Sequence, residues 1–227
     1  MKNIHLIAAA RPNFMKIAPL YHALKQAAWA KPTVVHTGQH YDINMSGSFF
    51  QDFGLTEPEI NLNVGSGSHA EQTGQVLMAY EKLLRKTKPD MVVVVGDVNS
   101  TMACTLAAVK VNFGIDPGVS DRKLGRRPLV GHLEAGLRSF DRSMPEEINR
   151  LVTDVLADVL WTPSEDADEN LMREGVAAEK IERVGNIMID ALEMMRPQVE
   201  AHRAYSDYGL APGAYGLVTL HRPSNVD

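Results

Sequence analysis

A carboxylate follows one of the apolar runs of this 227-residue chain. Gly96 and Asp97 come directly after residues 91–95, which are apolar at every position. An acid placed there can transfer a proton or contact a ribose hydroxyl group. The alternative is a flanking acid beside a helix cap, because Asn99 or Ser100 is suited to cap the helix that follows. Asp97 is therefore a candidate catalytic residue with a structural alternative.

More acids follow the next apolar run, residues 129–133. Glu134 comes directly after this run, and Glu146 and Glu147 lie a short distance further along the chain. Like charges that are held together in a dry pocket push their pKa values apart, as a general acid and a general base require. The alternative is the solvated acidic first turn of a helix, which fits Glu147 better than Glu134. Two or three acids are therefore expected to converge near one strand end.

Two cations open the first predicted helix. Arg11 and Lys16 lie where unpaired backbone N–H groups and the helix dipole favour an anion. They form either a phosphate site or a pair of solvated surface cations. The turn before this helix has none of the three glycines of the dinucleotide fingerprint, which disfavours a nicotinamide-dependent dehydrogenase.

The histidines and the cysteine do not indicate a metal site. His132 and Glu134 lie two residues apart on a predicted strand, but no third ligand accompanies them. His221 ends the last apolar run, and a lone histidine is more often structural than functional. The single cysteine, Cys104, excludes an internal disulfide and is expected to be a small buried residue in a helix.

These residues need a scaffold that brings the ends of the apolar runs together. Short runs rich in β-branched and aliphatic residues recur at residues 3–8, 33–37, 91–95, 129–133, 159–162, 181–184 and 216–220. Segments with helical spacing separate most of these runs. This alternation predicts an α/β fold with a doubly wound, Rossmann-like parallel sheet. In such sheets ligands bind outside the carboxyl ends of the strands.

Proline and glycine mark several boundaries. Pro145 is expected as the first residue of a helix that runs through Ala157, because proline suits the first helical position. A further helix is expected to open at Ser164 and to close at Gly175. Residues 112–127 lack periodicity and are predicted to be a surface insertion. 

Composition limits where in the cell the protein is expected and which classes of partner it is expected to bind. The net charge of −5 and the pI near 5.9 give no basic field of the kind that attracts nucleic acid. The start of the chain lacks the features of a signal peptide, and nowhere do about eighteen apolar residues run together. With a single cysteine, this composition predicts a cytoplasmic protein with no nucleic-acid or membrane partner.

Several of these strings, in this order, resemble the non-hydrolysing UDP-N-acetylglucosamine 2-epimerase family. The matching segments are residues 11–20, 37–40, 96–97, 130–138, 145–150, 184–186, 189–192 and 218–222. The resemblance implies two Rossmann-like domains in the glycosyltransferase-B arrangement. Residues 1–196 are expected to form the first domain. Pro197 interrupts a helical pattern, and residues 197–227 are expected to begin a second domain that the chain does not complete.

The resemblance implies a reaction that uses neither a metal nor a nicotinamide cofactor. In the family, UDP-N-acetylglucosamine loses its C2 proton and UDP by elimination, which leaves bound 2-acetamidoglucal. UDP then re-adds with protonation on the opposite face and gives UDP-N-acetylmannosamine. The C2 proton is weakly acidic, so carboxylates are needed on both faces and cations are needed at the departing diphosphate. The implied partners are these sugar nucleotides and a second copy of the chain, in a homodimer built through the first domain.

The resemblance also implies roles for single residues. Those that match catalytic residues of the family are Asp97, Glu134, Glu146 and His221. Those that match positions on the nucleotide and phosphate side are Arg11 and Lys16, and those expected to orient the carboxylates or the diphosphate are Arg138 and Arg150. Those that match an allosteric site for a second UDP-N-acetylglucosamine in some bacterial members are Gln39 and His40.

Two other functions stay open at this point. A glycosyltransferase with the same two-domain fold would release UDP only with an acceptor and would not exchange the C2 proton. A non-catalytic fragment would bind sugar nucleotides weakly or would pair with a separate chain. Fold alone does not separate these functions. The convergent carboxylates favour the epimerase over the transferase, whereas the early end of the chain favours the fragment for this chain in isolation.

Overall fold

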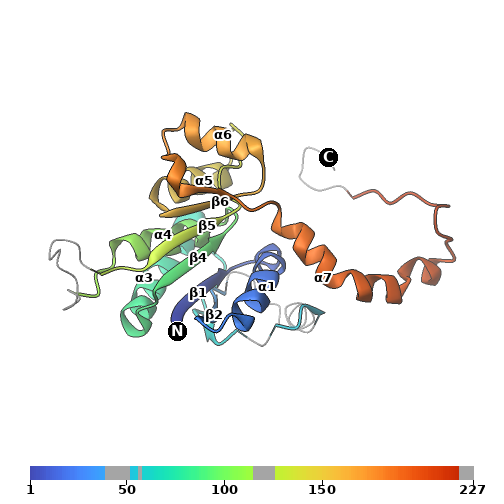
Figure 1. Ribbon diagram of the computed structural model, residues 1–227, viewed down its shortest axis with the longest axis horizontal. Helices are drawn as coiled ribbons and strands as arrows, with labels where there is room; N and C mark the ends of the chain where they lie inside the picture. The colour runs from blue at the N-terminus through green and yellow to red at the C-terminus, as the bar shows by residue number, and fades with distance from the viewer. Residues whose placement is uncertain (39–51, 56–57, 115–125, 220–227) are drawn as a thin grey trace.

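The computed structural model of the chain describes residues 1–38, 52–55, 58–114 and 126–219 (Figure 1). The strands within these ranges are β1 (Lys2–Ala8), β2 (Ala30–His36), β3 (Ile60–Asn61), β4 (Met91–Val95), β5 (Leu129–Leu133), β6 (Val159–Thr162) and β7 (Ile181–Arg183). The helices are α1 (Arg11–Gln26), α3 (His69–Thr87), α4 (Asn99–Lys110), α5 (Pro145–Leu156), α6 (Glu165–Arg173) and α7 (Ile187–His202). Short 3-10 turns lie at Ala178–Lys180 and Ala204–Tyr208.

The strands form one parallel sheet in the order β3-β2-β1-β4-β5-β6-β7. This order confirms the predicted doubly wound α/β fold, because the chain builds outward from β1 in one direction and then from β4 in the other. The direction reverses between β1 and β4, where Ile4 pairs with Met91. The carboxyl ends of β1, β4 and β5 therefore meet at the place where such sheets bind their ligands.

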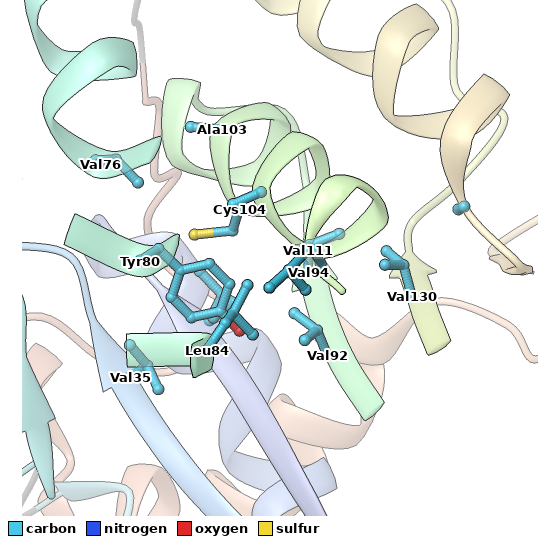
Figure 2. Packing of buried hydrophobic residues seen from close by; sticks show 14 of the residues in the cluster. Val35, Val76, Tyr80, Leu84, Val92, Val94, Ala103, Cys104, Val111 and Val130 are labelled. Atoms are coloured by element: carbon cyan, nitrogen blue, oxygen red, sulfur yellow. The ribbon is translucent and has the colours of Figure 1, made fainter. Parts of the chain in front are cut away.

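Two layers of helices cover the sheet, with α3 and α4 on one face and α1 and α7 on the other (Figure 1). In the first layer, Tyr80 and Leu84 of α3 and Cys104 of α4 pack against Val92 and Val94 of β4 (Figure 2). The burial of Cys104 in a helix confirms its predicted structural place. Strand β4 is covered on both faces, which is why its sequence is apolar without alternation.

Helix α4 begins differently from the prediction. Its N-cap is Val98, which has no side chain able to accept a hydrogen bond. The Asn99 side chain donates to Gln72 Oε1 of α3 at 2.9 Å, and the Ser100 hydroxyl lies 2.9 Å from the Thr37 hydroxyl after β2. The expected capping role of Asn99 or Ser100 was therefore wrong, because these side chains join α4 to its neighbours.

The end of the described chain also differs from the prediction. Helix α7 continues through Pro197 to His202 instead of being interrupted there. Pro197 is exposed, so the carbonyl group that loses its helical partner is open to water. Residues 216–219 are not a strand, since no neighbouring strand in the described ranges pairs with them. None of the helices described is long and apolar enough to cross a membrane.

The predicted insertion, residues 112–127, lies partly outside the described ranges. Backbone hydrogen bonds join the two ends of it that are described. The Phe113 amide donates to Arg126 O at 2.8 Å, and the Arg126 amide donates to Gly114 O at 3.1 Å. The segment therefore leaves and re-enters the fold at one place, between α4 and β5.

A buried polar pair lies inside this otherwise apolar core. His5 Nδ1 of β1 lies 3.1 Å from the Tyr80 hydroxyl of α3, and both side chains are buried. Burial lowers the pKa of His5 to about 4 and raises the pKa of Tyr80. His5 therefore stays neutral in the folded protein at pH values where the unfolded chain would take up a proton.

Stability is expected to fall as the pH is lowered from 7.5 to 5. The contribution of His5 is fully present above its unfolded pKa of about 6.5 and is lost as the pH falls toward 4, because only the unfolded state binds the proton. At pH 5 the loss is about 2 kcal/mol, which urea unfolding at the two pH values measures. His5→Asn should remove this part of the pH dependence, whereas His202→Asn at an exposed position should keep it. An unchanged pH dependence in His5→Asn would contradict the assignment.

Candidate active site

Asn13 joins the ends of β1 and β4 at the switch point of the sheet. Its side-chain oxygen accepts the backbone amide of Ala10 at 2.9 Å, and its side-chain nitrogen donates to Val95 O at 3.1 Å. The side chain is buried, so both bonds are shielded from water. They fix the first turn of α1 above the carboxyl end of β4.

An ion pair at this edge of the sheet joins α1 to Glu134, the first residue after β5. Lys16 Nζ lies 2.5 Å from Glu134 Oε2, with side-chain exposures of 17% and 13%. The pair passes over Gly96, where an added Cβ would lie 3.4 Å from Lys16 Nζ and where φ is +66°. Glu134 itself has φ +69°, a left-handed conformation that costs a non-glycine residue about 1 kcal/mol. Backbone strain at this residue is a mark of functional sites.

A second ion pair holds Asp97, the first residue after Gly96. Arg150 Nη2 of α5 lies 2.5 Å from Asp97 Oδ2, and Asn149 donates to the Asp97 carbonyl oxygen at 2.8 Å. Burial would lower the pKa of Arg150, but the charges of Asp97 and Glu147 raise it above its ordinary value. The arginine therefore remains a cation between two carboxylates.

Glu147 is buried, so the alternative of a solvated acid was wrong for this residue. Its carboxylate accepts the Ser139 amide and hydroxyl, each at 3.0 Å, the Phe140 amide at 3.0 Å and Arg150 Nη1 at 2.7 Å. Burial raises the pKa of Glu147, but these donors outweigh it and the net shift is downward. Glu147 ties the loop before α5 to Arg150, and through it to Asp97.

Glu146, next in sequence, is placed differently. It is half-buried in the first turn of α5, and within the described part of the chain it has no hydrogen-bond or ion-pair partner. An acid without a cation partner differs chemically from Asp97 and Glu134, which are each neutralised by one. The three predicted carboxylates thus lie near the carboxyl ends of the strands. Asp97 follows β4, Glu134 follows β5, and Glu146 lies at the start of α5.

Arg138 lies beneath the crevice and not in its opening. Its side chain is 1% exposed and donates to Asp154 Oδ2 at 2.7 Å and, through two nitrogens, to the Glu174 carboxylate at 2.8 and 2.7 Å. Burial lowers the pKa of Arg138, but Glu174 and Asp154 raise it above its ordinary value overall. A direct contact with a substrate would require these bonds to break.

The remaining predicted site residues lie outside the described structure. Gln39, His40 and His221 fall in segments that are not described, and for Arg11 only the backbone, as the first residue of α1, is described. Their predicted roles stay predictions.

Two supporting side chains, Asn13 and Asn149, were not singled out by the sequence reasoning, and Glu147 was favoured there as a solvated acid. Asn13 holds the turn before α1, whereas Asn149 and Glu147 contact the Asp97–Arg150 pair from α5. The usable signal for Asn13 was its position shortly after β1, since polar residues at strand ends lie near the ligand-binding edge of a doubly wound sheet. The arrangement can draw a proton to a carboxylate and can receive a departing anion at a cation.

Comparison with known proteins gives a consistent result. The family model described as UDP-N-acetylglucosamine 2-epimerase matches residues 22–227. The UDP-N-acetylglucosamine 2-epimerase of Methanocaldococcus jannaschii is 43% identical over 229 aligned residues, which cover 99% of this chain and 58% of that protein. The Pseudomonas aeruginosa protein named UDP-2,3-diacetamido-2,3-dideoxy-D-glucuronate 2-epimerase is 41% identical, over 97% of this chain and 58% of that protein. This chain therefore spans less than two thirds of the length of either relative.

Solved structures agree with the sequence relatives. The crystal structure of Methanocaldococcus jannaschii UDP-GlcNAc 2-epimerase in complex with UDP-GlcNAc and UDP has a TM-score of 0.79 and 41% sequence identity. The match covers 91% of this chain and 52% of that chain. A lipopolysaccharide outer core galactosyltransferase has a TM-score of 0.54 at 15% identity and shows likeness of fold alone. The predicted fold, a first domain of the glycosyltransferase-B type, is confirmed.

Glu147→Ala is expected to lower the free energy of unfolding by about 3 kcal/mol, because it leaves buried donors and Arg150 without a partner. Glu146→Ala, one residue earlier and without a described partner, should change it by less than about 0.5 kcal/mol. Urea unfolding of the two variants measures the contrast. Equal losses in both variants would show that Glu147 does not anchor the loop.

Proposed function

The chain belongs to the UDP-N-acetylglucosamine 2-epimerase family, and from that premise we propose that it supplies the proton-transfer side of an enzyme that epimerises UDP-N-acetylglucosamine at C2. The observation that supports this most is the pair of carboxylates at neighbouring strand ends, Asp97 and Glu134, each held by a cation from a different helix. Proton transfer at carbon needs such acids, and loss of UDP needs such cations.

The proposed reaction runs by elimination and re-addition. A carboxylate takes the C2 proton while the bond from C1 to UDP breaks, which leaves enzyme-bound 2-acetamidoglucal and UDP. UDP then adds back at C1 as a second carboxylate delivers a proton to the other face of C2, and UDP-N-acetylmannosamine forms. No electrons leave the substrate overall, so the reaction needs no redox cofactor.

We assign the proton transfers to three carboxylates and the charge compensation to nearby cations. Asp97, Glu134 and Glu146 are the proposed acids and bases, and Lys16 and Arg150 are the proposed partners of developing negative charge. Assigned on family resemblance are Arg11 on the nucleotide and phosphate side and His221 as a further catalytic residue. On the same resemblance, Gln39 and His40 are assigned to an allosteric site for a second UDP-N-acetylglucosamine. For Arg138 we propose orientation of the carboxylate-bearing turns in place of substrate contact.

The substrate is the part of the proposal with a close competitor. One relative at 41% identity is named for UDP-2,3-diacetamido-2,3-dideoxy-D-glucuronate, which shares the 2-acetamido group and the UDP moiety. Relatives at 43% and 40% identity are named for UDP-N-acetylglucosamine, and we commit to that substrate. Parallel assays with both nucleotides decide between them, and faster conversion of the diacetamido sugar would change the substrate while keeping the chemistry.

The domain boundaries follow the same resemblance. We propose that residues 1–196 form the first Rossmann-like domain and that residues 197–227 lead into a second. We also propose a cytoplasmic location, which fits the single, buried Cys104.

We further propose a homodimer through α5, because this helix is polar on its buried side and apolar on its exposed side. Its fully buried side chains are Glu147, Asn149, Thr153 and Asp154. Ile148 and Val155, two turns apart, are 41% and 68% exposed. A second copy would cover this apolar face, which is otherwise costly to leave in water.

The role of Glu134 is testable in a chimera in which residues 1–227 are followed by the part of the Methanocaldococcus jannaschii relative beyond the match. Glu134→Gln is expected to lower conversion of UDP-N-acetylglucosamine about 10²- to 10⁴-fold, because the variant cannot take a proton. Proton NMR of the sugar nucleotides measures conversion, and calorimetry measures UDP binding, which should persist.

The matched control for this test is Glu200→Gln, an exposed position on α7. It should leave both conversion and binding unchanged. Unchanged conversion in Glu134→Gln would remove Glu134 from the mechanism, and equal loss of conversion and UDP binding would make its role structural.

The dimer face is tested by Val155→Asp. The charge should convert a dimer into a monomer in light scattering coupled to gel filtration, since an unpaired carboxylate would be buried in the interface. Val199→Asp, at a position that is 59% exposed but lies on α7, should leave the mass unchanged. A monomeric wild-type chain, or a dimer that persists in Val155→Asp, would refute this interface.

A further inference from the structure

A continuous chain of hydrogen-bonded polar groups, buried except for its first member, runs behind the two carboxylate-bearing turns. It begins at Glu174, passes through Arg138 to Asp154, and continues through His132 to the carbonyl oxygen of Gly96. The two contacts of the histidine are 2.6 Å from Nδ1 to Asp154 Oδ1 and 2.8 Å from Nε2 to the Gly96 oxygen. The side chains of Arg138, Asp154 and His132 are fully buried.

The hydrogen bonds of His132 have a defined direction. The Gly96 carbonyl oxygen can only accept, so Nε2 donates to it. Burial raises the pKa of Asp154, but His132 and Arg138 outweigh it, and the net shift is downward. Asp154 is therefore a carboxylate that accepts from Nδ1 of the ring. The imidazole bridges two partners, of which Asp154 lies 22 and Gly96 lies 36 residues from His132 in sequence.

Asp154 braces both turns of the proposed active site at once. One of its oxygens accepts from His132, which holds the Gly96 carbonyl and so the peptide that leads into Asp97. Its other oxygen accepts the Gly136 amide at 3.1 Å, in the turn that begins with Glu134. The buried Asp154 carboxylate thus sets the spacing between the two turns without contacting substrate.

Both turns contain left-handed backbone positions. Gly96 and Glu134 have φ values of +66° and +69°. At Gly136, with φ +79°, a Cβ would collide with the carbonyl group of Ala167. For Glu134, a non-glycine residue, the left-handed conformation persists only when the surrounding contacts hold it. A buried ionic chain is also a costly way to gain stability, since apolar residues of equal volume often serve as well or better.

We propose that His132 and Asp154 are positioning residues that set the placement of Asp97 relative to Glu134, and that the buried Arg138 links them to Glu174 at the surface. The inference rests on the proposed function, because it gives these residues a role in the same reaction. Neither side chain touches the crevice itself, so their effect passes through the two turns.

The test compares two substitutions of similar volume. In His132→Gln the side-chain amide reaches as far as Nε2 and can still donate to the Gly96 oxygen. In His132→Met a side chain of the same length has no donor. A difference between these variants therefore reports the hydrogen bond and not the filling of space.

The first readout uses the 227-residue chain without any substrate. In ¹H–¹⁵N NMR spectra, the Asp97 amide signal is expected to stay near its wild-type position in His132→Gln and to shift in His132→Met, since it adjoins the carbonyl that loses its donor. Thermal unfolding of both variants identifies any that fail to fold. If His132→Met does not fold, Asp154→Asn, which keeps the size of the side chain, takes its place and should shift both the Asp97 and the Gly136 signals. Signals that remain in place in folded variants would overturn the proposal.

The second readout is catalysis in the chimera. His132→Met is expected to lower kcat about 100-fold with little change in KM, and His132→Gln should recover most of the loss, since misplacement of a reacting group acts on the chemical step. Equal kcat values for the two variants would overturn the proposal. A wild-type chimera that fails to convert UDP-N-acetylglucosamine would refute the proposed function instead, and the NMR comparison would still decide the positioning role.

Discussion

The candidate active site depends on one electrostatic constraint, which is that each of the two carboxylates at the ends of β4 and β5 needs a cation beside it. The fold meets this constraint by bringing one cation to each carboxylate from a different helix, Lys16 from α1 and Arg150 from α5. Because the two cations come from separate helices, both ion pairs form only when α1 and α5 are packed in place.

This constraint explains the unusual character of α5. The helix must present Arg150 and Asn149 to the Asp97 turn and Asp154 to the Glu134 turn, so its inward face is polar. Its apolar residues are left on the outside, and Val155 is an example. The helix that supports the candidate active site therefore has an apolar outer face. In the proposed dimer, this outer face would form the contact between the two copies.

Much of the scaffold could be predicted, because its signals are local. The bounds of β4 and β5 follow from short apolar runs, and Pro145 marks the start of α5. The features that were not predicted depend on contacts with residues far away in the sequence. The burial of Glu147 depends on a loop that folds back onto it, and β3 has only two residues and exists because β2 lies beside it.

The site was predictable to a similar degree. The carboxylates stood out because they follow apolar runs at the strand ends where doubly wound sheets bind their ligands, whereas His132 and Asp154 behind them did not. His132 reads as one polar residue in a strand, and Asp154 reads as one acid in a helix. Their contact joins residues 22 positions apart and becomes visible only when β5 and α5 are packed. 

The most direct test of the central claim is deuterium incorporation at C2 when UDP-N-acetylglucosamine is incubated with the wild-type chimera in D₂O. The account predicts that the C2 proton signal disappears from both UDP-N-acetylglucosamine and UDP-N-acetylmannosamine as the two interconvert, because each passage through the glucal exchanges that proton with a solvent-derived one. Interconversion with the original proton retained at C2, or no interconversion at all, would contradict it.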